Sequence, residues 1–390
     1  MWLPKHSLIK IAALYLAMIL CMTFVSKAEI TEWGGNELVA NIRQALYFGS
    51  FFYVYALVKS LGDIRFARRL LIVFAVLGSI LTIAQSIYGA EPMFGAEISS
   101  ESDMQSFYNV STWNQFDSIG GVLTRVNLPV ISVIVWSFLQ KGLSLAKRSN
   151  PSTLFMLPLF SAAIFIDYAR GLFFGLFLSL AVWAWLEIRR RRKQAVATIL
   201  RLSWIGGLVI ASLILFAHAL DVDYVSELRE RLLSAQDDIA TTSGSWDFRM
   251  DELRQFRDME VTPIDVALGF GLFPHNSFIG LPYLHYGFGD VMYRGGVFFA
   301  CILVIFLFKV LKLLIAITER IESRELQISA QACFLYLVVL LGFFVSANQL
   351  WSVHPMGVFN IALALVAVHV NILESADTRV SDESNTQFHQ

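Results

Sequence analysis

Residues 295–317 read GGVFFACILVIFLFKVLKLLIAI, and this stretch decides the class of the protein. A helix needs about 20 mostly apolar residues to cross the hydrocarbon core of a bilayer. Only Lys309 and Lys312 interrupt the apolar run. The sequence therefore predicts a membrane-spanning helix at this position.

Similar apolar runs recur along the whole chain of 390 residues. We count ten candidate spans, at about 8–26, 44–61, 70–89, 121–140, 152–168, 170–187, 196–217, 295–317, 327–347 and 356–373. They predict an all-α protein: a polytopic membrane helix bundle of about 10 transmembrane helices, forming one integral-membrane domain over residues 1–390. Its first partner is the lipid bilayer.

Composition supports this class and excludes others. Hydrophobic residues make up 56% of the chain and charged residues only 16%, whereas soluble domains carry about 25% charged residues. This balance argues against a secreted enzyme, a disordered scaffold or a nucleic-acid binder. The three cysteines form no CxxC pair, so neither a disulfide framework nor a zinc site is expected.

The distribution of basic residues predicts the orientation. With the N-terminus in the cytoplasm, 20 of the 30 Lys and Arg residues fall in cytoplasmic stretches, as the positive-inside rule requires. Ten spans then place both termini in the cytoplasm, with a cytoplasmic disordered tail at 374–390. The longest polar segment, 218–294 between spans 7 and 8, becomes a large helical extracytoplasmic loop.

That loop contains two predicted helices. The first starts at Asp221 and is amphipathic, with apolar residues at helical spacing. The second is capped by Ser245 or Asp247. It carries Arg249 and Arg257 and turns three apolar side chains inward, those of Phe248, Leu253 and Phe256.

A glycine-rich turn follows in the same loop, at 269–276, which reads GFGLFPHN. Gly269 and Gly271 shape this turn, which presents His275 and Asn276 at the start of another apolar helix. A histidine at a helix N-terminus stays neutral, which suits a proton acceptor. No strand precedes the glycines and no Gly-Lys-Ser follows them. The turn is therefore not a phosphate loop, and we expect no nucleotide cofactor and no metal.

Several arginines lie in or next to predicted spans, where an ionisable side chain costs free energy. Arg170 sits between two apolar spans, with Asp167 three residues before it as a candidate partner. Arg125 occupies a similar outer position, where a headgroup contact by its long side chain is the alternative. Arg294 could equally anchor to headgroups. Because the arginine fork binds two phosphate oxygens at once, arginines gathered beside His275 indicate a site for a lipid-linked diphosphate. His354 is the reserve candidate for the base.

Three of these elements resemble the O-antigen ligase and O-antigen polymerase superfamily of bacterial surface-polysaccharide enzymes. They are Asp167-Tyr-Ala-Arg170-Gly171, Arg249 with Leu253 and then Pro263, and Gly269-Phe-Gly271 followed by His275-Asn276. The ten spans and the place of the large loop resemble the family too. Ala169 departs from the family's serine, and the expected Glu-x-Gly after the His-Asn element is missing.

The resemblance implies an enzyme of the bacterial inner membrane. It would move a glycan from an undecaprenyl-diphosphate carrier to an acceptor glycan at the outer leaflet, without metal or cofactor. Arg170 and Arg249, with Arg125 as a third, would hold the diphosphate, Asn276 would contact substrate, and His275 would activate the acceptor hydroxyl. Chain-length or export proteins of a polysaccharide pathway would be further partners.

Two other classes stay open. A secondary transporter or lipid-linked glycan flippase would also be polytopic, although no internal repeat is visible in the sequence. A non-catalytic subunit of a polysaccharide export complex is the third reading. The sequence leaves polymerase and ligase, the sugar and the acceptor undecided.

Overall fold

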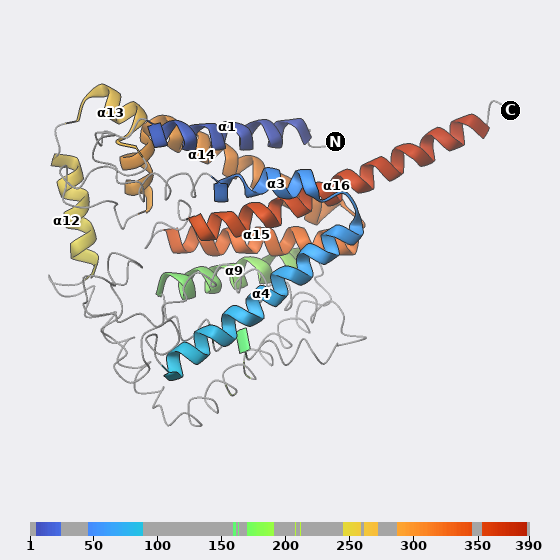
Figure 1. Cartoon of the computed structure of the whole chain (residues 1–390), viewed down its shortest axis with the longest axis horizontal. Coiled ribbons are helices and arrows are strands. Elements are labelled where there is room, and N and C mark those ends of the chain that lie inside the picture. The colour runs from blue at the N-terminus through green and yellow to red at the C-terminus, as the bar shows by residue number, and fades with distance from the viewer. Residues whose placement is uncertain are drawn as a thin grey trace. The chain divides into compact units, whose positions relative to one another are not determined.

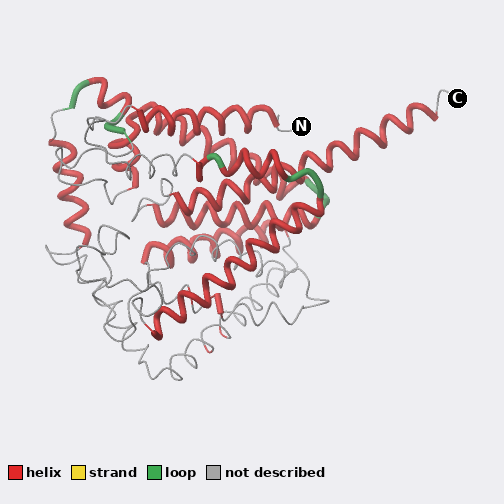
Figure 2. Tube along the Cα trace, in the orientation of Figure 1, coloured by secondary structure: helices red, strands yellow, loops and turns green. Residues whose placement is uncertain are grey.

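The computed structural model describes residues 5–24, 46–88, 170–190, 245–258, 261–271, 287–344 and 353–387, with a few isolated positions between 159 and 211. All regular structure in these ranges is α-helical (Figures 1 and 2). Short described connections join α3 to α4 at 58–60 and α14 to α15 at 321–323. The helices are α1 (Lys5–Phe24), α3 (Ser50–Leu57), α4 (Leu61–Tyr88), α9 (Arg170–Arg190), α12 (Ser245–Asp258), α13 (Pro263–Leu268), α14 (Gly287–Arg320), α15 (Arg324–Phe344) and α16 (Val353–Gln387).

Four of the described helices are long and apolar enough to cross a membrane. They correspond to the predicted spans 70–89, 295–317, 327–347 and 356–373, and lie at Leu61–Ala84, Gly287–Arg320, Arg324–Phe344 and Pro355–Ser375. The spans predicted at 8–26 and 170–187 fall on shorter apolar helices, and the span at 44–61 falls mainly on α3. The spans predicted at 121–140, 152–168 and 196–217 lie outside the described ranges. The protein is therefore a helical membrane protein, and the number of spans stays a prediction.

Helix ends differ from the predicted span ends for local reasons. The predicted span at 70 leaves out Arg65 and its basic neighbours, yet α4 begins at Leu61. The Asp63 carboxylate accepts the backbone N–H groups of Lys59 and Ser60, at 3.1 and 2.9 Å, and caps the helix. At the other terminus, α16 is helical as far as Gln387, where the sequence predicted a disordered tail at 374–390. That segment contains neither proline nor glycine to end a helix.

The chain separates into two compact units. The first comprises residues 1–67, 174–178 and 236–390, and the second comprises 68–173 and 179–235. In the second unit, the buried Ser79 and Thr82 hydroxyls donate to the carbonyls of Ala75 and Gly78 within α4. Hydrogen bonds of this kind give the polar side chains of a helix partners within the helix where water does not reach them.

In the first unit, α15 lies against both α14 and α16, while α1 packs on α14 and α3 packs on α16. In their most apolar stretches, α15 and α16 are 72% buried, compared with 28% for α14. The remainder of α14 exposes large apolar side chains such as Phe298, Val304 and Phe308. An apolar outer surface of this kind is unfavourable in water and fits a lipid bilayer as surroundings.

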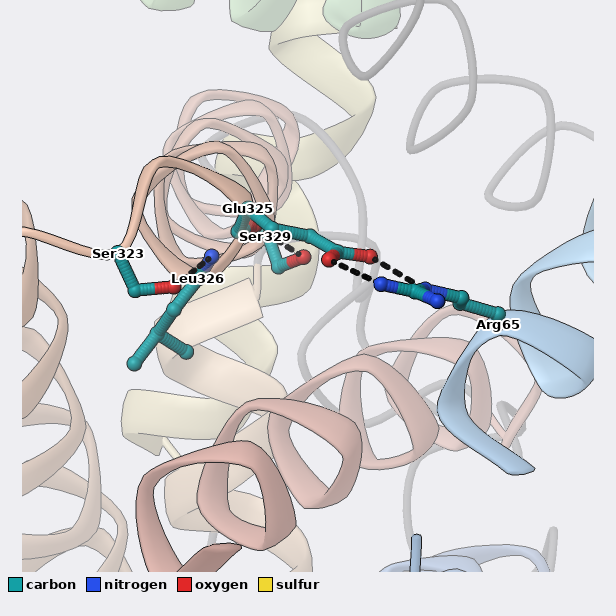
Figure 3. A network of polar contacts seen from close by, with 5 residues as sticks. All are labelled: Arg65, Ser323, Glu325, Leu326 and Ser329. Atoms are coloured by element: carbon teal, nitrogen blue, oxygen red, sulfur yellow. Dashed lines mark hydrogen bonds and ion pairs between the residues drawn. The ribbon is translucent and has the colours of Figure 1, made fainter. Parts of the chain in front are cut away.

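The two ends of the first unit differ in chemistry. At one end, the N-terminal turns of α4 and α15 meet, because the Arg65 guanidinium binds the Glu325 carboxylate at 3.3 Å (Figure 3). Lys59, Arg320 and Arg324 flank these basic turns. In Figure 1, α1 starts and α16 ends toward this same end. The opposite end holds α12, α13 and the start of α14.

Candidate functional site

Helix α12 has the two-sided character that the sequence predicted. Leu253 and Phe256 are half-buried, whereas Arg254 and Arg257 are exposed. Arg254 binds Asp251 and Arg257 binds Asp258, both at 2.8 Å. The Arg257 hydrogen bond lowers the pKa of the Asp258 carboxyl. These two arginines are thus matched by neighbouring acids on the helix.

Helix α13 is short, and its start is fixed locally. Pro263 occupies the first turn, where its missing N–H costs nothing. The Thr262 hydroxyl accepts the Asp265 backbone N–H, and the buried Asp265 carboxylate accepts the Thr262 backbone N–H at 3.0 Å. This reciprocal cap directs the chain from α12 into the glycine turn.

The glycine turn, residues 269–271, is hydrogen-bonded to α14. The Phe270 N–H donates to the Tyr293 carbonyl at 2.8 Å, and the Gly271 N–H donates to the Arg294 carbonyl at 2.9 Å. Gly269 and Gly271 have φ values of 71° and 91°, a region that favours glycine. A Cβ on Gly269 would overlap the backbone of Arg294. The backbone of the turn therefore approaches α14 more closely than a side chain would permit.

Helix α14 is broken at the place where the turn meets it. Gly296 has φ 60° and ψ −166°, which separates a short helix at 287–295 from the long helix at 297–320. Carbonyls at the end of a helix lack intrahelical partners. The N–H groups of Phe270 and Gly271 bind two carbonyls at this end of the short helix. The predicted start of the span at 295 coincides with the break rather than with the start of α14.

A buried ion pair lies on the short helix. The Nε of Arg294 is 2.9 Å from one carboxylate oxygen of Asp290 and 3.1 Å from the other. The Asp290 side chain is fully buried and that of Arg294 is 9% exposed. The alternative of a headgroup anchor for Arg294 is therefore wrong, because the side chain points into protein and binds a carboxylate. Sequence reasoning missed Asp290, although the spacing of four residues between the two charges signals such a pair.

Tyr293 joins the three elements of the site. Its ring centroid is 5.2 Å from that of Phe270 in the turn and 5.7 Å from that of Phe256 on α12. The side chain is fully buried. Among the described residues, the Tyr293 hydroxyl has no hydrogen-bond partner. The packing of this tyrosine thus connects α12, the glycine turn and α14.

The structure describes only part of the predicted site. Gly269 and Gly271 are fully described, and Arg249 lies on α12, although its side chain is outside the described set. Arg170 is the first residue of α9 and belongs to the second unit. His275, Asn276 and Arg125 lie outside the described ranges, as does the side chain of His354. The meeting of Arg170, Arg249 and His275 in one site therefore stays a prediction.

The described residues of this arrangement offer backbone hydrogen bonds and packing contacts. Within the described ranges, no group of three or more His, Cys, Asp or Glu side chains could hold a metal ion. What the residues do provide is a turn hydrogen-bonded to α14, from which the chain continues to the His-Asn pair after three residues. Comparison of the chain with models of protein families gave no match, and comparison with curated proteins gave none either.

Proposed function

We propose that the chain is a membrane glycosyltransferase of the polysaccharide polymerase or ligase type. It transfers a glycan from an undecaprenyl-diphosphate carrier to a hydroxyl of an acceptor glycan at the outer leaflet of the inner membrane. The observation that carries the proposal is the glycine turn. Hydrogen bonds hold this turn on α14 at the end of the unit opposite the basic turns, and the His-Asn pair follows it after three residues in sequence.

Sidedness supports the proposal. Basic segments at the ends of spans normally stay in the cytoplasm, and the N-terminal turns of α4 and α15, with the residues just before them, carry Lys59, Arg65 and Arg324. The glycine turn lies at the other end of α14, and therefore belongs on the outer side under the same rule. That is the side on which a lipid-linked glycan would be extended.

The proposed reaction follows from the residue types. His275 accepts the proton of the acceptor hydroxyl, whose oxygen forms a bond to the anomeric carbon of the donor glycan. The bond from that carbon to the diphosphate oxygen breaks, and undecaprenyl diphosphate leaves. Arg170 and Arg249, assisted by Arg125, stabilise the negative charge that develops on the leaving diphosphate. Asn276 contributes a hydrogen bond to the substrate.

The test is substitution of Arg170, Arg249 and His275 by alanine in cells that lack the native copy. Each variant is expected to lower surface-glycan assembly by at least tenfold. Arg254→Ala is the matched control, because Arg254 lies on the same helix as Arg249 and is exposed and bound to Asp251. Glycan of normal amount and length in all three variants would end the proposal.

A transporter or flippase is the second candidate, and the break in α14 is what favours it. Discontinuous helices form substrate sites in many transporters. The Gly296 break, however, leaves nine residues on one side and 24 on the other, so it lies near an end of the helix rather than at its middle. Purified protein in liposomes distinguishes the two functions: elongation of a lipid-diphosphate glycan marks the enzyme, and translocation without bond formation marks the transporter.

A further inference from the structure

We infer that the buried Asp290–Arg294 pair positions the glycine turn at 269–271, from which the chain continues in sequence toward His275. The catalytic meaning of this inference rests on the proposed glycosyl transfer. The structural part does not, because it concerns only residues 269–271 and 287–296. Asp290 and Arg294 are positioning residues here, with no contact to substrate assigned to them.

The first step is the stability of the short helix at 287–295. A helix of this length is marginal without additional interactions. Asp290 lies in its first turn and Arg294 lies in its last turn before the Gly296 break. Each charge is thus at the end of the helix dipole that favours it. The ion pair, at 2.9 Å, joins the two turns of the helix.

The second step connects the pair to the glycine turn. Arg294 supplies both the guanidinium of the pair and the carbonyl that accepts the Gly271 N–H at 2.9 Å. The neighbouring carbonyl of Tyr293 accepts the Phe270 N–H at 2.8 Å. Whatever holds the last turn of the short helix therefore also holds the two acceptors on which the glycine turn depends.

The third step is the burial of both charges. Removing one partner of a buried ion pair takes away an interaction that offsets the desolvation of the other charge. The remaining side chain then gains by moving toward water, and the last helical turn moves with it. Replacing both partners by neutral amides removes this penalty and retains a pair able to form a hydrogen bond. The single variants are therefore expected to loosen the glycine turn, and the double variant is expected to restore it.

The experiment measures amide hydrogen exchange at Phe270 and Gly271 in the full chain in lipid nanodiscs. Asp290→Asn and Arg294→Gln are each expected to speed exchange at these two amides by at least tenfold, and the double variant is expected to restore the wild-type rate. Glu325→Gln is the matched control, because it breaks an exposed arginine–carboxylate pair at the other end of the unit. It is expected to leave both amides unchanged.

Activity is measured on the same proteins. The single variants are expected to lower kcat for glycan transfer by at least tenfold with KM within threefold, and the double variant is expected to recover most of it. Wild-type exchange rates in both single variants would overturn the inference. Unfolding of the whole protein in both single variants would also overturn it, since the pair would then maintain the fold in general. If exchange responds as expected but the wild type transfers no glycan, the proposed function fails and the positioning role stands.

Discussion

At the scale of single residues, two buried tyrosines differ in whether their hydroxyl groups have a hydrogen-bond partner. The Tyr336 hydroxyl donates to the Pro355 carbonyl at 3.2 Å inside the bundle. Tyr293 is as fully buried, yet among the described residues its hydroxyl has no partner. Burying a polar group without a hydrogen bond costs free energy, and removing one member of a bonded pair costs free energy as well.

Tyr336→Phe and Tyr293→Phe are therefore expected to have opposite effects. The first leaves a buried carbonyl without its donor and should lower the free energy of unfolding by about 1–3 kcal/mol. The second removes a hydroxyl with no partner, and should leave stability unchanged or raise it. Thermal unfolding of the two variants in the same detergent provides the comparison. A loss for Tyr293→Phe equal to that for Tyr336→Phe would mean that the Tyr293 hydroxyl is bonded.

Gly296 is the residue on which the break in α14 depends. Its φ of 60° with ψ of −166° lies in a region used almost only by glycine, and a Cβ there would overlap the Ala267 carbonyl. Gly296→Ala should therefore lower the free energy of unfolding by about 1–3 kcal/mol or more. Gly62→Ala is the control, because a Cβ at Gly62 meets its nearest atom at 3.4 Å. Equal melting temperatures for the two variants would show that the break is not required.

At the scale of elements, close approach of helices depends on small residues. Gly342 on α15 faces Gly175 in α9 residues 174–178, and a Cβ on Gly342 would lie 2.7 Å from the Gly175 Cα. Small residues at such crossings allow backbones to pack tightly where no hydrophobic force drives helices together in lipid. This close contact is thus possible because neither Gly342 nor Gly175 has a side chain.

Gly342→Ala is accordingly expected to push α15 away from residues 174–178 and to lower the melting temperature. The matched substitution is Gly357→Ala on α16, where a Cβ meets its nearest atom at 3.6 Å, an ordinary contact. That variant should retain the wild-type melting temperature. Thermal unfolding in nanodiscs compares the two, and a Gly342→Ala protein as stable as Gly357→Ala would contradict the glycine contact.

The sequence predicted those elements whose signal is local. Apolar runs predicted four helices that could span the membrane, and the alternation of Leu253 and Phe256 with arginines predicted α12. The predicted span begins at 70 because hydropathy excludes the basic residues from Arg65 onward. The helix itself begins earlier, at Leu61, because Asp63 caps it there. The link between the short helix and the glycine turn was missed because it depends on hydrogen bonds between residues 23 positions apart. The Asp290–Arg294 pair was missed although its spacing of four residues is local.

At the scale of the whole molecule, only relations inside the first unit bear on sidedness. Arg65 and Glu325 join two basic turns at one end, and the glycine turn lies at the other end of α14. The segment at 297–320 spans about 36 Å at 1.5 Å per residue, which exceeds the hydrocarbon thickness of a bilayer. A helix of that length is long enough to separate the two ends by the thickness of a membrane.

Cysteine accessibility in intact cells tests this separation. In a chain whose Cys21, Cys301 and Cys333 are replaced, Val261→Cys reports the end with the glycine turn and Glu322→Cys reports the basic end; both native side chains are exposed. A membrane-impermeant maleimide is expected to label Val261→Cys directly and Glu322→Cys only after the cells are permeabilised, because basic turns stay in the cytoplasm. The reverse pattern would invert the orientation and place the candidate site on the cytoplasmic side, away from a glycan carried in the outer leaflet. Labelling of both from outside would mean that α14 does not separate two compartments, and the membrane assignment of this helix would fail with it.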